Sequence, residues 1–139
     1  MTTEGNKARY SQFIQSIFNE GKFDELSGYL APSYQIKDAP PGAPQGAEGV
    51  RAASSMFRSA FPDLEITLDS VIAEGDTVAA RSTVRGTHNV PFFGIAPTGK
   101  QVSVTSLTMV RIVDGRLVES WVKTDTAGLM SQLGAGAPA

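Results

Sequence analysis

The sequence predicts an α+β domain in which helices come first and an antiparallel sheet follows. Before Pro62, apolar side chains recur at helical spacing, whereas after it apolar and polar side chains alternate. Two acidic-glycine turns, Glu74-Gly75-Asp76 and Asp114-Gly115, divide the second part into hairpins. Because each strand has two unlike faces, one face must meet the helices, which predicts a strongly curved sheet that encloses a cone with a mouth at one end.

Three helices and one strand are expected before Pro62. The first helix covers residues 10–18, and a second short helix begins at residue 23 and stops at Ala31-Pro32, because a residue before proline disfavours the helical region. A short strand over residues 33–38 and a proline-rich loop follow, and the third helix covers residues 50–61. The order is therefore ααβα.

Four strands are expected after Pro62, over residues 64–73, 77–87, 101–113 and 116–124. One face of this sheet stays uncovered by helices. We expect that face to carry four valines, Val102, Val104, Val110 and Val122. Burial of these side chains predicts a homodimer that forms through the outer sheet face.

Composition limits the classes of function. The 139 residues fit one domain, and the formal net charge of −2 with a pI of about 5.3 argues against nucleic acid or an anionic membrane surface as a partner. The absence of cysteine excludes disulfides, thiolate metal sites and a cysteine nucleophile, and it fits a reducing compartment. No apolar run has membrane-spanning length and the first residues lack a signal-peptide core, so we expect a cytoplasmic protein.

Short sequence blocks occur in a characteristic order: Phe61-Pro62-Asp63-Leu64, Ala73-Glu74-Gly75-Asp76, Arg85-Gly86-Thr87-His88, Gly94-Ile95-Ala96-Pro97-Thr98-Gly99-Lys100, Arg111-Ile112-Val113-Asp114-Gly115, Val118-Glu119-Ser120-Trp121 and Asp125. This order resembles that of the SnoaL-like polyketide cyclases over residues 8–134, with both termini outside the core. The resemblance implies the nuclear-transport-factor-2-like cone fold, often as a dimer packed through the outer sheet face, and a hydrophobic, polyketide-like small molecule as substrate. It leaves the reaction open, since a fold hosts many chemistries.

The resemblance gives Asp125 a catalytic role. Asp125 matches the carboxylate that cyclases of the family use as acid/base, four residues beyond Trp121. Burial would raise the pKa of such a carboxylate and let it work near neutral pH. The alternative is an N-cap, because residues 126–133 could form a terminal helix and Asp is a preferred cap.

His88, the only histidine, is the second catalytic candidate, because imidazole titrates near neutrality. Cyclases of this type commonly place a histidine beside the acidic residue in the late strands. Here Ser120 stands directly before Trp121 and no histidine occurs between residues 101 and 125, so only His88 could form a His-Asp pair. The alternative is a histidine that hydrogen-bonds the loop that follows it.

Seven further residues are candidates for substrate binding: Asp38, Tyr10, Tyr34, Arg81, Trp121, Phe57 and Met109. The tyrosines could donate to a carbonyl oxygen, and an arginine in the middle of a strand could anchor a carboxylate. Each has a structural alternative: core packing for the aromatic residues, a solvated turn for the aspartate, and solvent or an interface for the arginine. Phe92 and Phe93 could form a lid or pack inward.

Three functions remain open. The first is a cyclase or isomerase of polyketide-type biosynthesis that needs no metal or cofactor and works by acid/base assistance or by conformational control. The second is an epoxide-opening or hydroxylation-associated enzyme, for which Asp38 or Glu119 would supply a second carboxylate. The third is a non-catalytic binding or dimerisation module, with a cavity closed by Trp121, Met109 and Phe57.

Overall fold

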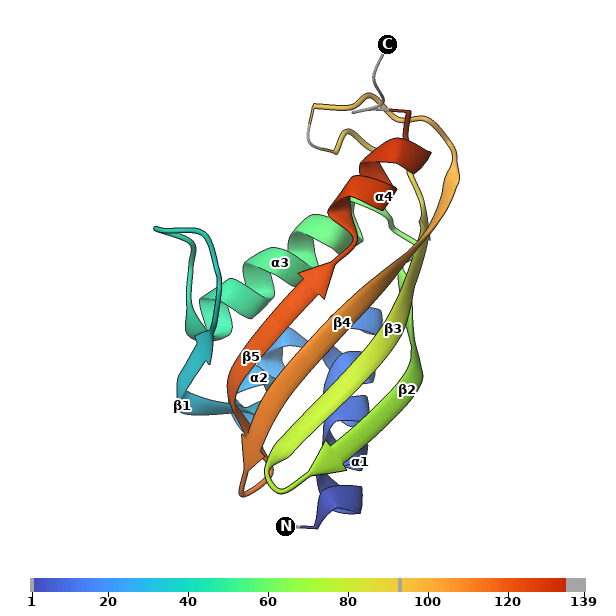
Figure 1. Ribbon diagram of the computed structural model, residues 1–139. Coiled ribbons are helices and arrows are strands. Elements are labelled where there is room, and N and C mark those ends of the chain that lie inside the picture. Colours follow the sequence, from blue (N-terminus) through green and yellow to red (C-terminus); the bar gives the residue numbers. More distant parts are fainter. Residues whose placement is uncertain (1, 93, 135–139) are drawn as a thin grey trace.

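The computed structural model describes residues 2–92 and 94–134 (Figure 1). The N-terminal part consists of α1 (Thr3–Phe13), the π-helical η1 (Ile14–Asn19), the 3₁₀ segment η2 (Phe23–Glu25), α2 (Leu26–Tyr29), β1 (Leu30–Ile36) and α3 (Gly46–Ala60). The C-terminal part consists of β2 (Glu65–Glu74), β3 (Thr77–Thr87), β4 (Gln101–Val113), β5 (Arg116–Thr124) and α4 (Thr126–Gln132). Met1, Phe93 and residues 135–139 lie outside the described residues.

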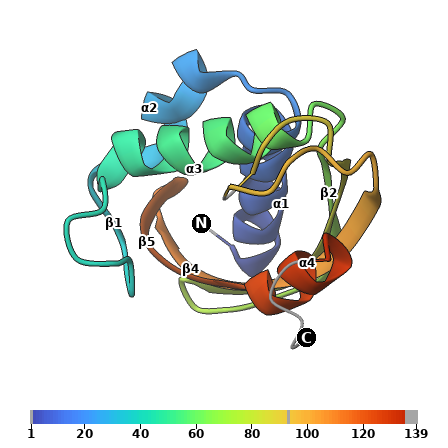
Figure 2. The ribbon, with the colours of Figure 1, turned by 90° about the horizontal axis from the view of Figure 1, so that it is seen from above.

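The five strands form one mixed sheet in the order β1-β5-β4-β3-β2. Strands β2 to β5 make an antiparallel meander, and β1 adds to β5 in parallel. Seen from above, the sheet curves around α1 while α3 lies across the open side (Figure 2). The predicted α+β cone is confirmed, with both long helices on one concave face.

The sheet hairpins follow the turn residues closely. Strands β3, β4 and β5 have the predicted bounds, and β2 is shifted by one residue. Asp114 and Gly115 both have positive φ, 52° and 78°, as the mirror-image hairpin turn requires. The meander was therefore predictable from local turn chemistry.

The helices differ more from the prediction. The first helix begins at Thr3, not at residue 10, and widens into η1 after Phe13. The second predicted helix is reduced to η2 and α2, because the chain already enters β1 at Leu30. Pro32 lies inside β1, which is an edge strand, where a missing N–H is tolerated.

The four valines expected on the outer face lie on the inner one. Val102, Val104 and Val110 are 6%, 5% and 1% exposed, and Val122 lines the internal cavity. The opposite face of the sheet carries other large apolar side chains that are exposed: Ile72, Leu107, Met109 and Trp121. The alternation of apolar and polar residues predicted two unlike faces, but it did not predict which face is concave. The assignment of the four valines to the outer face was therefore wrong.

Side-chain amides satisfy backbone groups that strand pairing leaves free. The Asn19 side chain accepts from the N–H of Ile66 (2.7 Å) and donates to its carbonyl (3.0 Å), on edge strand β2. Gln45 makes the same pair with Ile36 on β1, and Gln132 with Ser103 on β4. These bonds protect exposed strand backbone and tie η1, α3 and α4 to the sheet.

Candidate functional site

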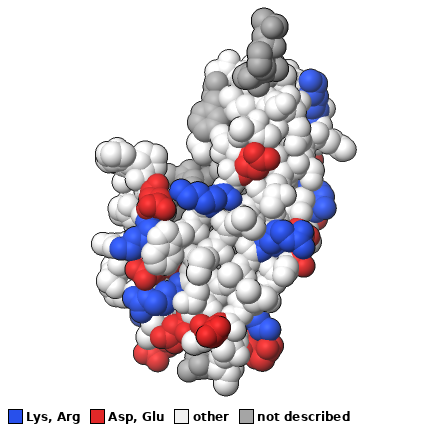
Figure 3. All heavy atoms as spheres, viewed as in Figure 1, with Lys and Arg blue, Asp and Glu red and all other residues white. Residues whose placement is uncertain are grey.

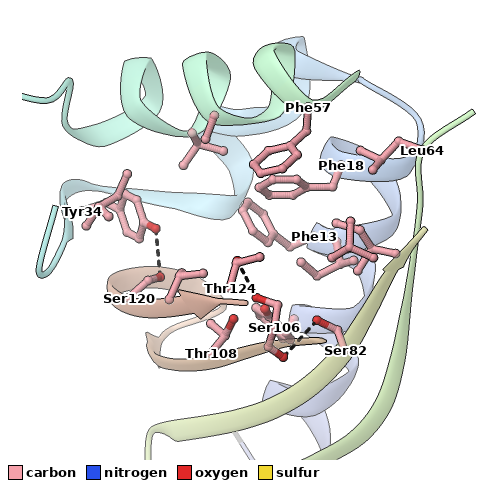
Figure 4. A pocket seen from close by; sticks show the side chains of 18 residues that line it. Phe13, Phe18, Tyr34, Phe57, Leu64, Ser82, Ser106, Thr108, Ser120 and Thr124 are labelled. Carbon is pink, nitrogen blue, oxygen red and sulfur yellow. Dashed lines mark hydrogen bonds between the residues drawn. The ribbon is translucent and has the colours of Figure 1, made fainter. Parts of the chain in front are cut away.

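A cavity of about 210 Å³ lies between the concave sheet face, α1 and α3 (Figure 4). Its wall is largely apolar, with five aromatic side chains: Tyr10, Phe13, Phe18, Tyr34 and Phe57. Aliphatic side chains from η1, α3 and the strands line the wall between them. An apolar cavity with a few directed polar groups is the usual form of a small-molecule site.

The cavity opens where β1 ends. Ile36, the last residue of β1, pairs with Ser120, so the rest of β5 has a hydrogen-bonded neighbour on one side only. Val122 follows on β5, lines the cavity and is 46% exposed. The mouth therefore lies between the end of β5 and α3.

Hydroxyl groups form the polar part of the wall. Ser82, Ser106 and Thr124 lie opposite one another on β3, β4 and β5. Ser82 Oγ donates to the Ser106 carbonyl (3.4 Å), and the Ser106 and Thr124 hydroxyls are 3.0 Å apart. Further along β5, Tyr34 Oη donates to Ser120 Oγ at 2.9 Å (Figure 4).

The two cavity tyrosines stay protonated at neutral pH. Burial raises the pKa of Tyr10 to about 12, against the opposing effect of a hydrogen bond with Thr108. Burial also raises the pKa of Tyr34. Both phenols are therefore hydrogen-bond donors over the physiological range and not bases.

The described cavity wall holds no acidic, basic or histidine side chain. Its polar groups are seven hydroxyls, those of Tyr10, Tyr34, Ser82, Ser106, Thr108, Ser120 and Thr124. Such a wall can orient carbonyl and hydroxyl oxygens of a ligand, and it cannot pair with a ligand charge.

Asp125 lies just outside the cavity. It follows Thr124 at the end of β5, is exposed, and accepts the Gly128 N–H with Oδ1 at 2.9 Å as the N-cap of α4. The burial on which the acid/base prediction depended is therefore absent, and the geometry is that of the alternative, a helix cap.

His88 is fully buried beyond the end of β3, away from the cavity wall. Its Nδ1 accepts the Thr98 N–H at 3.2 Å and lies 3.0 Å from the Thr98 hydroxyl, and Phe61 and Phe92 pack against the ring. An accepting Nδ1 means a neutral imidazole with its proton on Nε2. No His-Asp pair forms, and His88 fastens the loop over residues 89–100 to the core.

Four substrate-binding candidates lie outside the cavity. Arg81, Met109 and Trp121 line a shallow groove on the outer sheet face, because they occupy the strand positions between the inward ones. Asp38 is exposed after β1 and faces Lys123 on β5, with 3.6 Å between charged atoms. Tyr10, Tyr34 and Phe57 do line the cavity, as predicted from the sequence.

The carboxylate pair needed for epoxide opening does not form at the cavity. Glu119 faces outward and lies 3.1 Å from Arg111 and 3.7 Å from Lys37. Asp38 forms an ion pair with Lys123 and does not pair with the Glu119 carboxylate. The closed cavity of a binding module is not formed either, because of its three proposed residues only Phe57 lines the wall.

Sequence reasoning overlooked the Ser and Thr hydroxyls. On β4, Ser106 and Thr108 interrupt an inward row that otherwise reads Val102, Val104, Val110 and Ile112. Hydroxyls in the middle of a buried apolar row were the available signal, because a buried hydroxyl needs a partner.

Two searches of residues 2–92 and 94–134 gave negative results. No described helix is long and apolar enough to cross a membrane. No described cluster of three or more His, Cys, Asp or Glu side chains could hold a metal ion.

Comparison with known proteins identifies a family. The family model described as SnoaL-like polyketide cyclase matches residues 8–133. Aklanonic acid methyl ester cyclase DauD of Streptomyces sp. (strain C5) is 29% identical over 121 residues, 84% of this chain and 74% of that protein. Nogalonic acid methyl ester cyclase of Streptomyces nogalater is 29% identical over 122 residues, 86% and 90% of the two chains. The structure of TsrD from Streptomyces laurentii superposes with a TM-score of 0.86 at 33% identity, over 97% of this chain and 98% of that one.

The buried geometry of His88 predicts a large effect on stability. We expect His88→Ala to lower the free energy of unfolding by about 2–4 kcal/mol, because it leaves a cavity between Phe61 and Phe92 and an unpaired Thr98 N–H. Urea unfolding measures this change, with the exposed Asn89→Ala as the control. Unchanged stability of His88→Ala would contradict the anchoring role.

Proposed function

Since this chain belongs to the SnoaL-like polyketide cyclase family, we propose that it closes a ring in a polyketide-type small molecule held in the cavity, by conformational control and without a cofactor. The observation that carries this proposal is the wall of aromatic and hydroxyl groups around about 210 Å³. Sites that enclose a drug-sized ligand measure roughly 300–1,000 Å³, so the cavity takes the reacting part of a larger molecule and leaves the rest in the mouth.

Ring closure of this kind is an isomerisation. The enol form of the substrate attacks a carbonyl carbon of the same molecule and a C–C bond forms. The carbonyl π electrons move to its oxygen, which ends with the proton that the enol oxygen loses. No oxidant or reductant is consumed, and folding the flexible chain into a reactive geometry supplies much of the acceleration.

The first test uses the esters for which two relatives are named, aklanonic acid methyl ester and nogalonic acid methyl ester. A cyclised product has the mass of its substrate and a changed chromatographic retention time. We expect Ala53→Phe, which fills the cavity from α3, to lower kcat/KM at least about tenfold, since misplacement of reacting groups is costly. The control Ala52→Phe changes the exposed neighbouring position and keeps the activity. Equal activity of the two variants would argue against this cavity as the site.

Asp125→Asn separates conformational control from acid/base assistance. Asn still caps α4 but cannot exchange a proton, so we expect kcat within about threefold of wild type, whereas a general acid/base contributes roughly 10²–10⁴-fold. Asp125→Ala removes the cap and lowers stability by about 1 kcal/mol. A loss of activity of two orders of magnitude in Asp125→Asn, with stability unchanged, would assign catalysis to this carboxylate.

The same proposal includes a cytoplasmic homodimer that forms through the outer sheet face. That face carries four exposed large apolar residues, Ile72, Leu107, Met109 and Trp121. In Figure 3, which views this face, uncharged atoms lie between separate charged groups, and Arg81 and Lys123 line the same groove as the apolar side chains. Exposed apolar patches of this kind mark association surfaces.

Light scattering tests the dimer against the monomer mass of 14.7 kDa. We expect twice that mass for the wild type and a monomer for Leu107→Lys, because a lysine in the middle of the patch would be buried without a partner. Met56→Lys changes an exposed apolar residue on α3 and should leave the mass unchanged. A wild-type monomer at micromolar concentration would refute the dimer.

A further inference from the structure

One hydroxyl in the cavity keeps its proton for a ligand. Tyr34 donates a hydrogen bond to Ser120 Oγ at 2.9 Å. Among the described residues, Ser120 Oγ has no second hydrogen bond. A serine that accepts one bond still has its own proton to donate. Because Ser120 lines the cavity and is only 3% exposed, a ligand there is the natural acceptor.

Three other hydroxyls of the wall have hydrogen-bond partners of their own. Ser82 donates to the Ser106 carbonyl, and the Ser106 and Thr124 hydroxyls pair. At Ser120 the donor is assigned: Tyr34 donates to Ser120 Oγ, whereas either hydroxyl of the Ser106 and Thr124 pair could be the donor. The Ser120 proton is therefore not used in its bond with Tyr34.

On the basis of the proposed function, we propose that Ser120 donates this proton in a hydrogen bond to the carbonyl oxygen that ring closure converts into a hydroxyl group, and that Tyr34 is its positioning residue. Negative charge develops on that oxygen as the C–C bond forms, so the bond is stronger in the transition state than in the ground state. Ser120 keeps its proton, while the enol proton of the substrate ends on the new hydroxyl. The Ser120 hydroxyl donates this hydrogen bond in its neutral form, which is compatible with a cavity wall whose described residues carry no charged side chain.

The same wall restricts the substrate class. A buried ionised group would find no described counter-charge in the cavity and would lose its hydration. The part of the substrate that enters is therefore uncharged. Any ionised substituent stays in the mouth.

The chain offers a matched control pair. Ser16 and Tyr29 also form a serine-tyrosine bond, 3.1 Å long, outside the cavity wall. Loss of this bond tests what such a pair contributes to folding alone. An effect seen at Ser120 and Tyr34 but not at Ser16 and Tyr29 therefore belongs to the cavity.

Kinetics test the assignment of Ser120. We expect Ser120→Ala to lower kcat by about 10²-fold with KM changed less than about threefold, as for loss of one oxyanion donor. Tyr34→Phe should lower kcat less, and the double variant no more than Ser120→Ala alone, because Tyr34 acts through Ser120. Ser16→Ala and Tyr29→Phe keep kcat. A loss below threefold in Ser120→Ala, or the same loss in the controls, would overturn the assignment.

Binding of an unreactive ketone tests the donor without turnover. We expect 1-tetralone to bind about three- to tenfold more tightly than tetralin, which lacks the oxygen, and this preference to vanish in Ser120→Ala. The infrared carbonyl stretch of bound 1-tetralone should be lower in the wild type than in that variant. An unchanged stretch in both Ser120→Ala and Tyr34→Phe would overturn the proposal. A Ser120-dependent stretch without turnover of either ester would count against the cyclase function and leave the donor in place.

Discussion

The cross-strand register of β3, β4 and β5 is the constraint on which this molecule depends. In this register Ser82, Ser106 and Thr124 lie side by side and face the cavity. A shift of one residue along a strand would turn outward-facing residues inward, Leu107 among them on β4. The tight turn at Asp114-Gly115 sets the pairing of Ile112 with Leu117, and a one-residue shift between Ile112 and Arg111 then brings Ser106 opposite Thr124. The turn and this irregularity together control the chemistry of the cavity wall.

The carboxylate, arginine and histidine candidates lie outside the cavity, and this is the main consequence of the structure for function. The charged and ionisable candidates act in structural positions: Asp125 caps α4, and His88 fastens the loop between β3 and β4 to the core. At the start of that loop, Asp63 accepts from the N–H and hydroxyl of Thr87, and these hydrogen bonds lower its pKa. The polar groups left in the described cavity wall are hydroxyls, and the proposed function assigns to them the orientation of a neutral substrate.

The short first strand explains how a closed cone obtains a mouth. Because β1 ends at Ile36, the final residues of β5 have no partner on that side, and the cavity opens there. Exposed strand backbone is a liability, and the side chains of Asn19 and Gln132 satisfy it elsewhere in the sheet, while Gln45 does so at Ile36 itself. The strand backbone is thus protected up to the residue at which the sheet opens.

Local sequence determined the hairpins, the bounds of β2 to β5 to within one residue and the family, because turn residues and alternation act between neighbours in the chain. The first strand was predicted over residues 33–38 and runs from Leu30 to Ile36. The sequence also placed Tyr10, Tyr34 and Phe57 in the cavity, as aromatic residues in a small apolar core have few other places to go. Only the tertiary structure decided which sheet face is concave, and it put Arg81 and Trp121 outside. Only the tertiary structure also placed the serine and threonine hydroxyls in the cavity wall. Side chains of a strand alternate equally toward both sheet faces, and the packing of helices from distant segments decides which face is the inner one.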